Sequence, residues 1–276
     1  MNEARAWLAS GRSLRGFGWS IIDIHAHLGP YVGFEIPHGD ADGMVFTMDR
    51  LGIAVAGISA LTAINADYAR GNDLTASAVR RHPDRFVGYA VANPWEPERI
   101  SHELTRAFEE LGFRGIKIIP STWKLPVTDP RYEPIWAFAQ ERGTMVLSHT
   151  WAGDPTCRPS LFREIAARYP DVAFLLGHSG GPREGNVEAI DVAAACPNVY
   201  LELCYSQLTR RQLEEMVHAV GYERVLLGTD MPFIDPAFTI AKVICADLPE
   251  EQRRAIVGGN AERLLRASGA LAATGA

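Results

Sequence analysis

Histidines offer the clearest chemistry in this sequence. The chain has eight of them, and four come at the ends of short apolar segments: His25, His27, His149 and His178. His25 and His27 are two residues apart, so on a β-strand their side chains share one face, opposite Ile22 and Ile24. Two imidazoles placed in this way can converge on one metal ion. Asp230, after the apolar segment VLLG, adds a carboxylate near the end of the chain.

Each of these residues also has an ordinary structural explanation. A single histidine at a strand end is more often a hydrogen-bonded polar residue than a ligand. Asp230, followed by Met-Pro, could simply begin a turn. The whole set is hard to explain by core packing, because buried polar groups without partners are costly. Together these residues therefore predict a metal site.

The elements that must position these residues are short apolar segments rich in β-branched residues. Eight such candidate strands begin at Ile21, Val55, Phe86, Gly115, Thr144, Ala173, Val199 and Val225. Amphipathic stretches of helical length lie between most of them, and this alternation favours a parallel sheet. The length of 276 residues is close to the ~250 of one (β/α)8 barrel. We therefore predict a single-domain α/β protein, a (β/α)8 TIM barrel, in which the first and last strands are neighbours.

The domain boundaries follow from the same pattern. We expect an N-terminal extension over residues 1–20, the barrel over 21–267 and a flexible tail over 268–276. Hydrophobic residues make up 47% of the chain and charged residues 22%, which allows a sizeable core. The active site of such a barrel lies at the carboxyl ends of its strands, where the four histidines and Asp230 are expected.

Composition and charge limit the kinds of molecule that the protein is expected to bind. The net charge of -6 argues against nucleic acid, and no apolar run approaches the ~20 residues of a membrane span. The first twenty residues lack the apolar region of a secretory signal, and the four cysteines include no CxxC pair. We expect a cytoplasmic protein with reduced thiols that acts on a small molecule, either alone or as a homodimer.

Several segments resemble the amidohydrolase superfamily, in the branch that includes aminocarboxymuconate-semialdehyde decarboxylase. They span almost the whole chain: DIHAH, GNDLTASAVRRHPDRFVGYAVANP, GIKIIP, VLSHT, LLGHSGG, LLGTDMPF and GNAERLL. The resemblance implies that His25, His27, His149 and Asp230 are the metal ligands. It also implies that His178 orients the attacking water or the substrate without binding the ion.

The chemistry of these side chains agrees with the resemblance. Imidazole and carboxylate ligands suit zinc, with manganese and iron as alternatives. Bound zinc can lower the pKa of its water to about 7. Asp230 would then accept the proton of that water and His178 would polarise the substrate, which makes both residues catalytic. The resemblance to the mononuclear branch predicts one divalent ion, with zinc favoured.

Lys117, in GIKIIP, is the most ambiguous residue. In some binuclear relatives a carboxylated lysine at this strand end bridges two ions, with His149 and His178 on the second ion. Lys117 could instead anchor a substrate carboxylate or reach the surface as an ordinary lysine. We favour the anchor. Three further strand-end residues are expected to line the substrate pocket: Asn93, Trp151 and Glu202.

Three functions remain open on this sequence. The leading one is a metal-dependent hydrolase of a small amide, ester or lactone, because such a site usually serves to activate water. The alternative is a non-oxidative decarboxylase of a small unsaturated or aromatic carboxylic acid. The third is a barrel that binds a ligand without catalysis, which metal analysis would distinguish from an enzyme.

Overall fold

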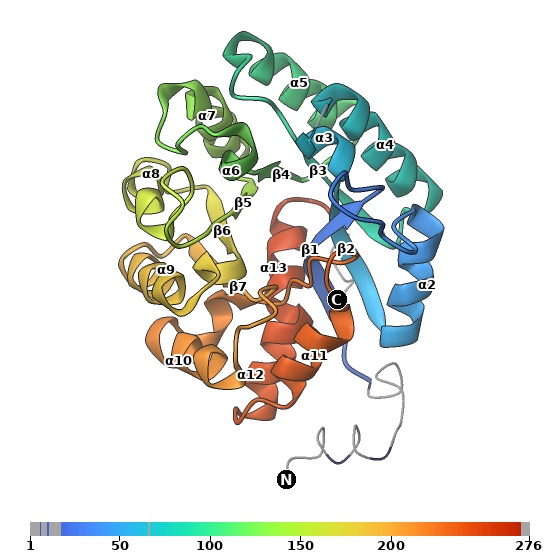
Figure 1. Cartoon of the computed structure of the whole chain (residues 1–276), viewed down its shortest axis with the longest axis vertical. Coiled ribbons are helices and arrows are strands. Elements are labelled where there is room, and N and C mark those ends of the chain that lie inside the picture. Colours follow the sequence, from blue (N-terminus) through green and yellow to red (C-terminus); the bar gives the residue numbers. More distant parts are fainter. Residues whose placement is uncertain (1–5, 7–9, 11–17, 66, 272–276) are drawn as a thin grey trace.

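The barrel expected from the sequence is present. A computed structural model of the chain describes residues 6, 10, 18–65 and 67–271. Eight parallel strands follow one another around the sheet in chain order, with helices on the outside (Figure 1). The strands are β1 (Ile21–Leu28), β2 (Ile53–Ala60), β3 (Phe86–Ala90), β4 (Gly115–Ile118), β5 (Met145–His149), β6 (Ala173–Gly177), β7 (Val199–Glu202) and β8 (Val225–Leu226).

The helices surround this sheet. They are α2 (Ala41–Leu51), α3 (Leu61–Asn65), α4 (Tyr68–Arg81), α5 (Pro97–Glu109), α6 (Pro120–Trp123), α7 (Glu133–Arg142), α8 (Phe162–Arg168), α9 (Arg183–Ala195), α10 (Arg210–Val220), α11 (Pro236–Ile244), α12 (Glu250–Arg254) and α13 (Asn260–Ala267). Local sequence sets their ends. At α10, for example, Thr209 and Gln212 form a reciprocal capping box that satisfies free amides of the first turn.

The barrel closes through the segment that follows β8. Because β8 has only two residues, the next five residues complete the contact with β1. The amide of Ile24 donates to the carbonyl of Leu227 at 3.0 Å, and the amide of Asp230 donates to the carbonyl of His25 at 2.8 Å. This closure brings Asp230 beside the His-x-His pair, as the sequence predicts.

One expectation about β1 is wrong. Ile22 and Ile24 point into the barrel, where they pack with inward residues of β3, β5, β6 and β8. His25 and His27 also face the interior, at its open end. Both sets fit on one side because the pairing register with β2 shifts between Asp23 and Ala26. Such a bulge re-aims the residues that follow it.

Asp23 holds this bulge in place. Its Oδ1 accepts hydrogen bonds from the amide of His25 at 3.0 Å and from the amide of Thr229 at 2.9 Å. These bonds replace ladder contacts that the shifted register removes. After the bulge, Ala26 and Leu28 join the outer core that packs against the helices. Asp23 was not among the residues predicted from the sequence to have a special role.

Apolar side chains fill the lower part of the barrel. The interior cluster contains Tyr89, whose hydroxyl donates to the carbonyl of Ile24 at 3.0 Å, and it is joined by Ala261 and Leu265 of α13. Gly57 on β2 makes room for this ring, because a Cβ there would lie 2.1 Å from the Tyr89 hydroxyl. The candidate metal ligands therefore lie above this apolar filling, at the carboxyl end of the strands.

Most residues of the predicted extension and the last residues of the predicted tail lie outside the described part of the chain. The boundaries at residues 20 and 268 thus stay predictions. No helix in the described ranges is long and apolar enough to span a membrane.

Candidate active site

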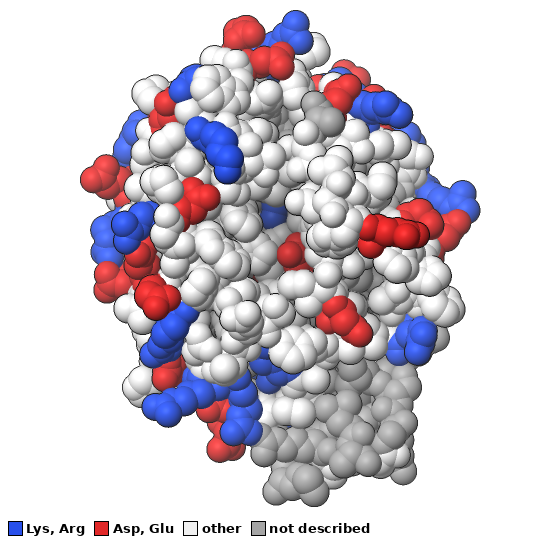
Figure 2. Space-filling view, viewed as in Figure 1, with Lys and Arg blue, Asp and Glu red and all other residues white. Residues whose placement is uncertain are grey.

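A cavity of about 260 Å³ opens at the carboxyl ends of the strands. In the space-filling view it is the hollow at the centre of the molecule, with acidic and basic side chains at its bottom (Figure 2). Its walls come from the ends of β1, β4, β5, β6 and the segment after β8, and from the loops that follow the strands. The lining residues are His25, His27, Tyr31, Leu61, Ile64, Asn65, Lys117, Ile119, Ser121, Thr122, His149, His178, Asp230 and Phe233.

Three side chains at the bottom of this cavity form a close group. His25 Nε2 and His27 Nε2 are 3.3 Å apart, and Asp230 Oδ1 lies 3.5 Å from the first and 3.2 Å from the second. Metal ligands about 2.0–2.2 Å from one ion lie roughly 3–3.5 Å from each other. The spacing of these three atoms therefore fits a shared divalent ion.

The backbone is strained where it delivers two of the predicted catalytic residues. Asp230 has φ 60° and His178 has φ 62°, in the left-handed region that side chains with a Cβ rarely adopt. Such strain persists only where the surrounding structure holds it, and it concentrates at functional sites. Here the amide of Asp230 is fixed by its bond to the carbonyl of His25.

His149 and His178 line the same cavity but stand outside the close group of three. His149 Nδ1 lies 3.0 Å from His178 Nε2, and Trp151 stacks on the His149 ring with a centroid distance of 6.0 Å and an interplanar angle of 7°. The structure thus unites three of the four predicted metal ligands and places His149 nearby. The role of His149 as fourth ligand stays a prediction.

Glu202 lies behind the histidines and not on the cavity wall. Its Oε2 is 3.0 Å from His25 Nδ1 and accepts from the amide of His178 at 2.9 Å, while its Oε1 accepts from the amide of Cys204 at 2.7 Å. The Cys204 thiol also donates to Oε2 at 2.9 Å. With Glu202 accepting from Nδ1–H, His25 keeps Nε2 free for an ion.

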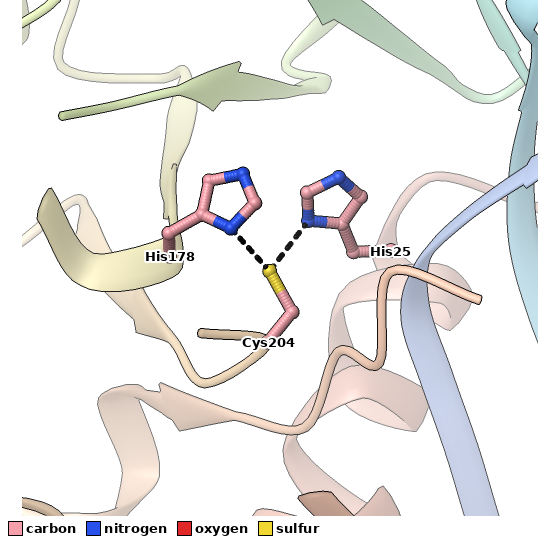
Figure 3. A group of neighbouring side chains, drawn as sticks. All are labelled: His25, His178 and Cys204. Carbon is pink, nitrogen blue, oxygen red and sulfur yellow. Dashed lines mark hydrogen bonds between the residues drawn. The ribbon is translucent and has the colours of Figure 1, made fainter. Parts of the chain in front are cut away.

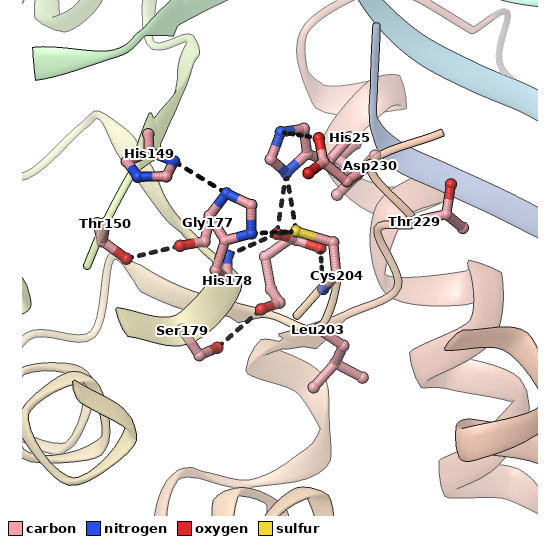
Figure 4. A network of polar contacts seen from close by, with 12 residues as sticks. His25, His149, Thr150, Gly177, His178, Ser179, Leu203, Cys204, Thr229 and Asp230 are labelled. Carbon is pink, nitrogen blue, oxygen red and sulfur yellow. Dashed lines mark hydrogen bonds and ion pairs between the residues drawn. The ribbon is translucent and has the colours of Figure 1, made fainter. Parts of the chain in front are cut away.

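Cys204 connects two of the histidines on this buried side. Its Sγ lies 2.9 Å from His178 Nδ1 and 3.4 Å from His25 Nδ1 (Figure 3). Figure 4 shows the contacts that run from His149 through His178 to Cys204. The Cys204 thiol continues this network to Glu202. Both ring nitrogens of His178 are engaged, so its ring has a fixed orientation.

Burial and nearby charges favour the protonation states in which the histidines and Asp230 can bind a metal ion. Burial lowers the pKa of His25, His27 and His149, and lowers that of His178 to about 4. Burial alone would raise the pKa of Asp230, but the neighbouring imidazoles hold it below its usual value. The site therefore presents neutral imidazoles and an ionised carboxylate, which are the forms that bind metal.

Lys117 is buried at the bottom of the cavity, with 1% of its surface exposed. This excludes the surface-lysine interpretation. Its Nζ lies 2.6 Å from His25 Nε2, and burial lowers its pKa to about 8. At neutral pH the side chain is still mostly a cation, placed beside the three potential metal ligands.

The other predicted substrate residues do not line the cavity. Asn93 accepts from the amide of Trp95 at 3.0 Å and shapes a turn, Trp151 packs behind His149, and Glu202 is fully buried. These residues do lie at the predicted strand ends, but their side chains do not line the cavity. The sequence analysis missed Tyr31, Phe233 and a polar group formed by Asn65, Ser121 and Thr122, all on segments that follow β1, β2, β4 or β8.

Glu202 is expected to support metal binding through His25. Glu202→Gln should weaken divalent metal binding by about 10–100-fold, because an amide accepts the His25 Nδ1 proton less well and lacks the negative charge that would offset a bound cation. The affinity is measured by titration against a competing chelator. Glu184→Gln, an exposed residue of α9, is the matched control. Unchanged affinity in Glu202→Gln would show that the carboxylate does not support the metal site.

The sequence is similar to those of two curated decarboxylases. Gamma-resorcylate decarboxylase of Polaromonas sp. strain JS666 is 24% identical over 262 residues, covering 77% of this chain and 80% of that protein. 2-Amino-3-carboxymuconate-6-semialdehyde decarboxylase of Dictyostelium discoideum is 26% identical over 234 residues, covering 70% of this chain and 65% of that protein.

A solved structure shares the fold. Dihydroxybenzoic acid decarboxylase from Polaromonas sp. JS666, with bound manganese and the inhibitor 2-nitroresorcinol, superposes with a TM-score of 0.73 at 21% identity, covering 90% of this chain and 97% of that one. The profile of one family, described as amidohydrolase, matches residues 22–267. Because the match covers nearly the whole barrel and every residue of the close group, the chain belongs to the amidohydrolase family.

Proposed function

We propose that this protein is a metal-dependent, non-oxidative decarboxylase of a small unsaturated or aromatic carboxylic acid. The observation that carries the proposal is Lys117, a buried cation at the bottom of the cavity beside the close group His25, His27 and Asp230. The curated relatives named above support it, since both are decarboxylases. Hydrolysis of an amide, ester or lactone, which the sequence favours, has less support from them.

Lys117 suits a substrate carboxylate. It is the only lysine or arginine among the described residues that line the cavity. In the described structure its Nζ contacts His25 Nε2, and that nitrogen cannot bind an ion and accept from Lys117 at once. Loading the site would therefore turn the ammonium toward an incoming anion, where charge-assisted hydrogen bonds are strong.

A divalent ion held by His25, His27, Asp230 and the predicted fourth ligand His149 would supply Lewis-acid polarisation of the bound substrate. We expect one such ion. Manganese becomes the first choice over zinc because the Polaromonas relative binds it, and iron stays an alternative. All three accept imidazole and carboxylate ligands.

The residues of the chain would then perform the proton chemistry. Lys117 holds the carboxylate, the bond between this group and the ring carbon breaks, carbon dioxide leaves, and the electron pair stays on the ring. A protonated acid must deliver a proton to that carbon. We assign the delivery of this proton to His178, whose ring lines the cavity and is fixed by His149 and Cys204. Its pKa of about 4 leaves the resting imidazole neutral, so His178 would take the proton from solvent once the negative charge of the bound substrate favours the imidazolium. Asp230, the other predicted catalytic residue, carries the negative charge that offsets the cations.

Product analysis tests the proposal directly. Metal-loaded protein is given a panel of aromatic and unsaturated carboxylic acids and lactones in isotopically labelled water, and carbon dioxide release and oxygen incorporation are measured in parallel. We expect carbon dioxide release, no oxygen label in the product, and loss of activity after chelation. Oxygen incorporation without carbon dioxide would instead establish the hydrolase.

A further inference from the structure

A second group of potential metal ligands lies behind the cavity, on the buried side of the histidines. Cys204 Sγ is 2.9 Å from His178 Nδ1 and 3.4 Å from His25 Nδ1 (Figure 3). One ligand atom from each of these three residues lies within 4.8 Å of the other two. Cys204 does not line the cavity. This inner group of His25, His178 and Cys204 therefore shares only His25 with the close group at the bottom of the cavity.

The spacing of the inner group suits an ion bound by sulfur and nitrogen. Zinc binds thiolate at about 2.3 Å and imidazole at about 2.0–2.1 Å, which places these donors roughly 3.6 Å apart in a tetrahedron. The distance from Cys204 to His25 is close to this value, and the His178 ring would have to move back by about 0.7 Å. Thiolate ligands select zinc and its heavier analogue cadmium, whereas manganese prefers oxygen and imidazole. The two groups therefore differ in the ions that they prefer.

The surroundings of the inner group can accommodate a divalent charge. Cys204 and His25 are fully buried, and an ion in such a place needs anionic partners. A ligating cysteine loses its proton, and the carboxylate of Glu202 lies beside the ion position, with Oε2 2.9 Å from Cys204 Sγ and 3.0 Å from His25 Nδ1. The thiolate and this carboxylate would together offset the two positive charges of the ion.

His25 is the residue that connects the two groups, because its ring faces both. Its Nε2 belongs to the close group with His27 and Asp230, and its Nδ1 belongs to the inner group. A neutral imidazole carries a proton on one nitrogen and a lone pair on the other, so it can bind an ion on one side at a time. With an ion at Nδ1, the proton would lie on Nε2, where Asp230 Oδ1 is 3.5 Å away. Lys117 would turn away from Nε2, which then offers no lone pair.

We propose that the inner group is a second metal site for a thiophilic divalent ion such as zinc or cadmium, and that ions at the inner site and at the cavity site exclude each other through His25. On binding, the ion forms bonds to Sγ of Cys204 and to Nδ1 of His25 and His178, and no group is oxidised or reduced. The thiol proton leaves to solvent, and the proton of His25 moves from Nδ1 to Nε2. His178 has its proton on Nε2, beside His149 Nδ1 at 3.0 Å. The consequence is a choice between a manganese-loaded form and a form blocked by a thiophilic ion.

Metal titration tests the inference without any substrate, so its outcome is independent of the proposed decarboxylase function. The full-length chain, freed of metal with a chelator, is titrated with cadmium chloride alone and after loading with manganese. Ultraviolet absorption reports cadmium–thiolate bonds, electron paramagnetic resonance reports released manganese, and elemental analysis gives the ions per chain. We expect thiolate absorption that saturates at one cadmium per chain, with release of one manganese for each cadmium bound. Cadmium binding without thiolate absorption, or one cadmium and one manganese held together, would overturn the inference.

Two variants should separate the sites in opposite directions. Cys204→Ser should abolish the thiolate absorption and raise the cadmium concentration that displaces manganese by roughly 10-fold or more, while manganese still binds. His27→Ala should lose manganese binding and keep the thiolate absorption, because the inner group is intact. Cys196→Ser, whose thiol donates to the carbonyl of Arg163 after α9, is the control and should change neither. Circular dichroism checks that each variant is folded. Thiolate absorption that persists in Cys204→Ser, or is lost in Cys196→Ser, would place the thiolate ligand elsewhere and contradict the proposal.

Discussion

Protein carrying both His25→Ala and His27→Ala is expected to hold no divalent ion and to lack measurable turnover, while remaining a folded barrel. The two changes remove two of the three closely spaced ligand atoms, and Asp230 with a more distant His149 cannot hold an ion tightly. The fold should survive because the apolar cluster below the site is untouched and Glu202 keeps three backbone and thiol donors. Metal content is measured by elemental analysis and folding by circular dichroism.

A matched control separates ligand loss from the general loss of two histidines. His102→Ala with His218→Ala changes two exposed histidines on helices and should leave metal content and activity unchanged. If the His25/His27 variant retained a stoichiometric ion, the metal site would lie elsewhere.

Substitution of His178 by asparagine should separate chemistry from metal binding. His178→Asn is expected to keep about one ion per chain and to lose roughly 10²-fold or more in turnover, the scale of losing one general acid or base. The reason is positional: His178 lines the cavity but stands outside the close group of His25, His27 and Asp230. Turnover under saturating substrate and metal content are measured on the same preparation.

The same experiment decides how many ions are bound. If wild-type protein holds two ions and His178→Asn loses one, the site is binuclear and carboxylated Lys117 is the expected bridge. One ion in both proteins supports the mononuclear site. His82→Asn, at the C-cap of α4 and not among the residues that line the cavity, is the control and should change neither quantity.

The strands could be predicted because their signal is local. Each begins as an apolar, β-branched segment such as the one at Ile21 or Val199, and the spacing of eight such segments leaves little choice of fold. The His25–His27–Asp230 group could also be predicted, because neighbouring strand ends of a barrel must meet. Both predictions, of the barrel and of this group, depend only on the order of the strands and helices along the chain.

The sequence could not predict which way individual side chains turn. Three residues stand at the expected strand ends but do not line the cavity: Asn93, Trp151 and Glu202. Asn93 forms a turn with Trp95, Trp151 stacks on His149, and Glu202 bonds to His25 behind the cavity. The polar group of Asn65, Ser121 and Thr122 was missed for a related reason, because these residues lie on short helices after the strands. Whether such residues face a cavity depends on three-dimensional packing, which strand periodicity does not encode.

The bulge in β1 affects how water can reach a bound ion. On a regular strand, inward-facing residues are separated by about two residue rises, or roughly 6.6 Å. The register shift between Asp23 and Ala26 makes Ile24 and His25 successive inward residues, which moves the ligands closer to the apolar residues below them by about one rise, ~3.3 Å. A bound ion would therefore lie directly against apolar residues on its inner side. Solvent and substrate would then compete for the side that faces the cavity opening.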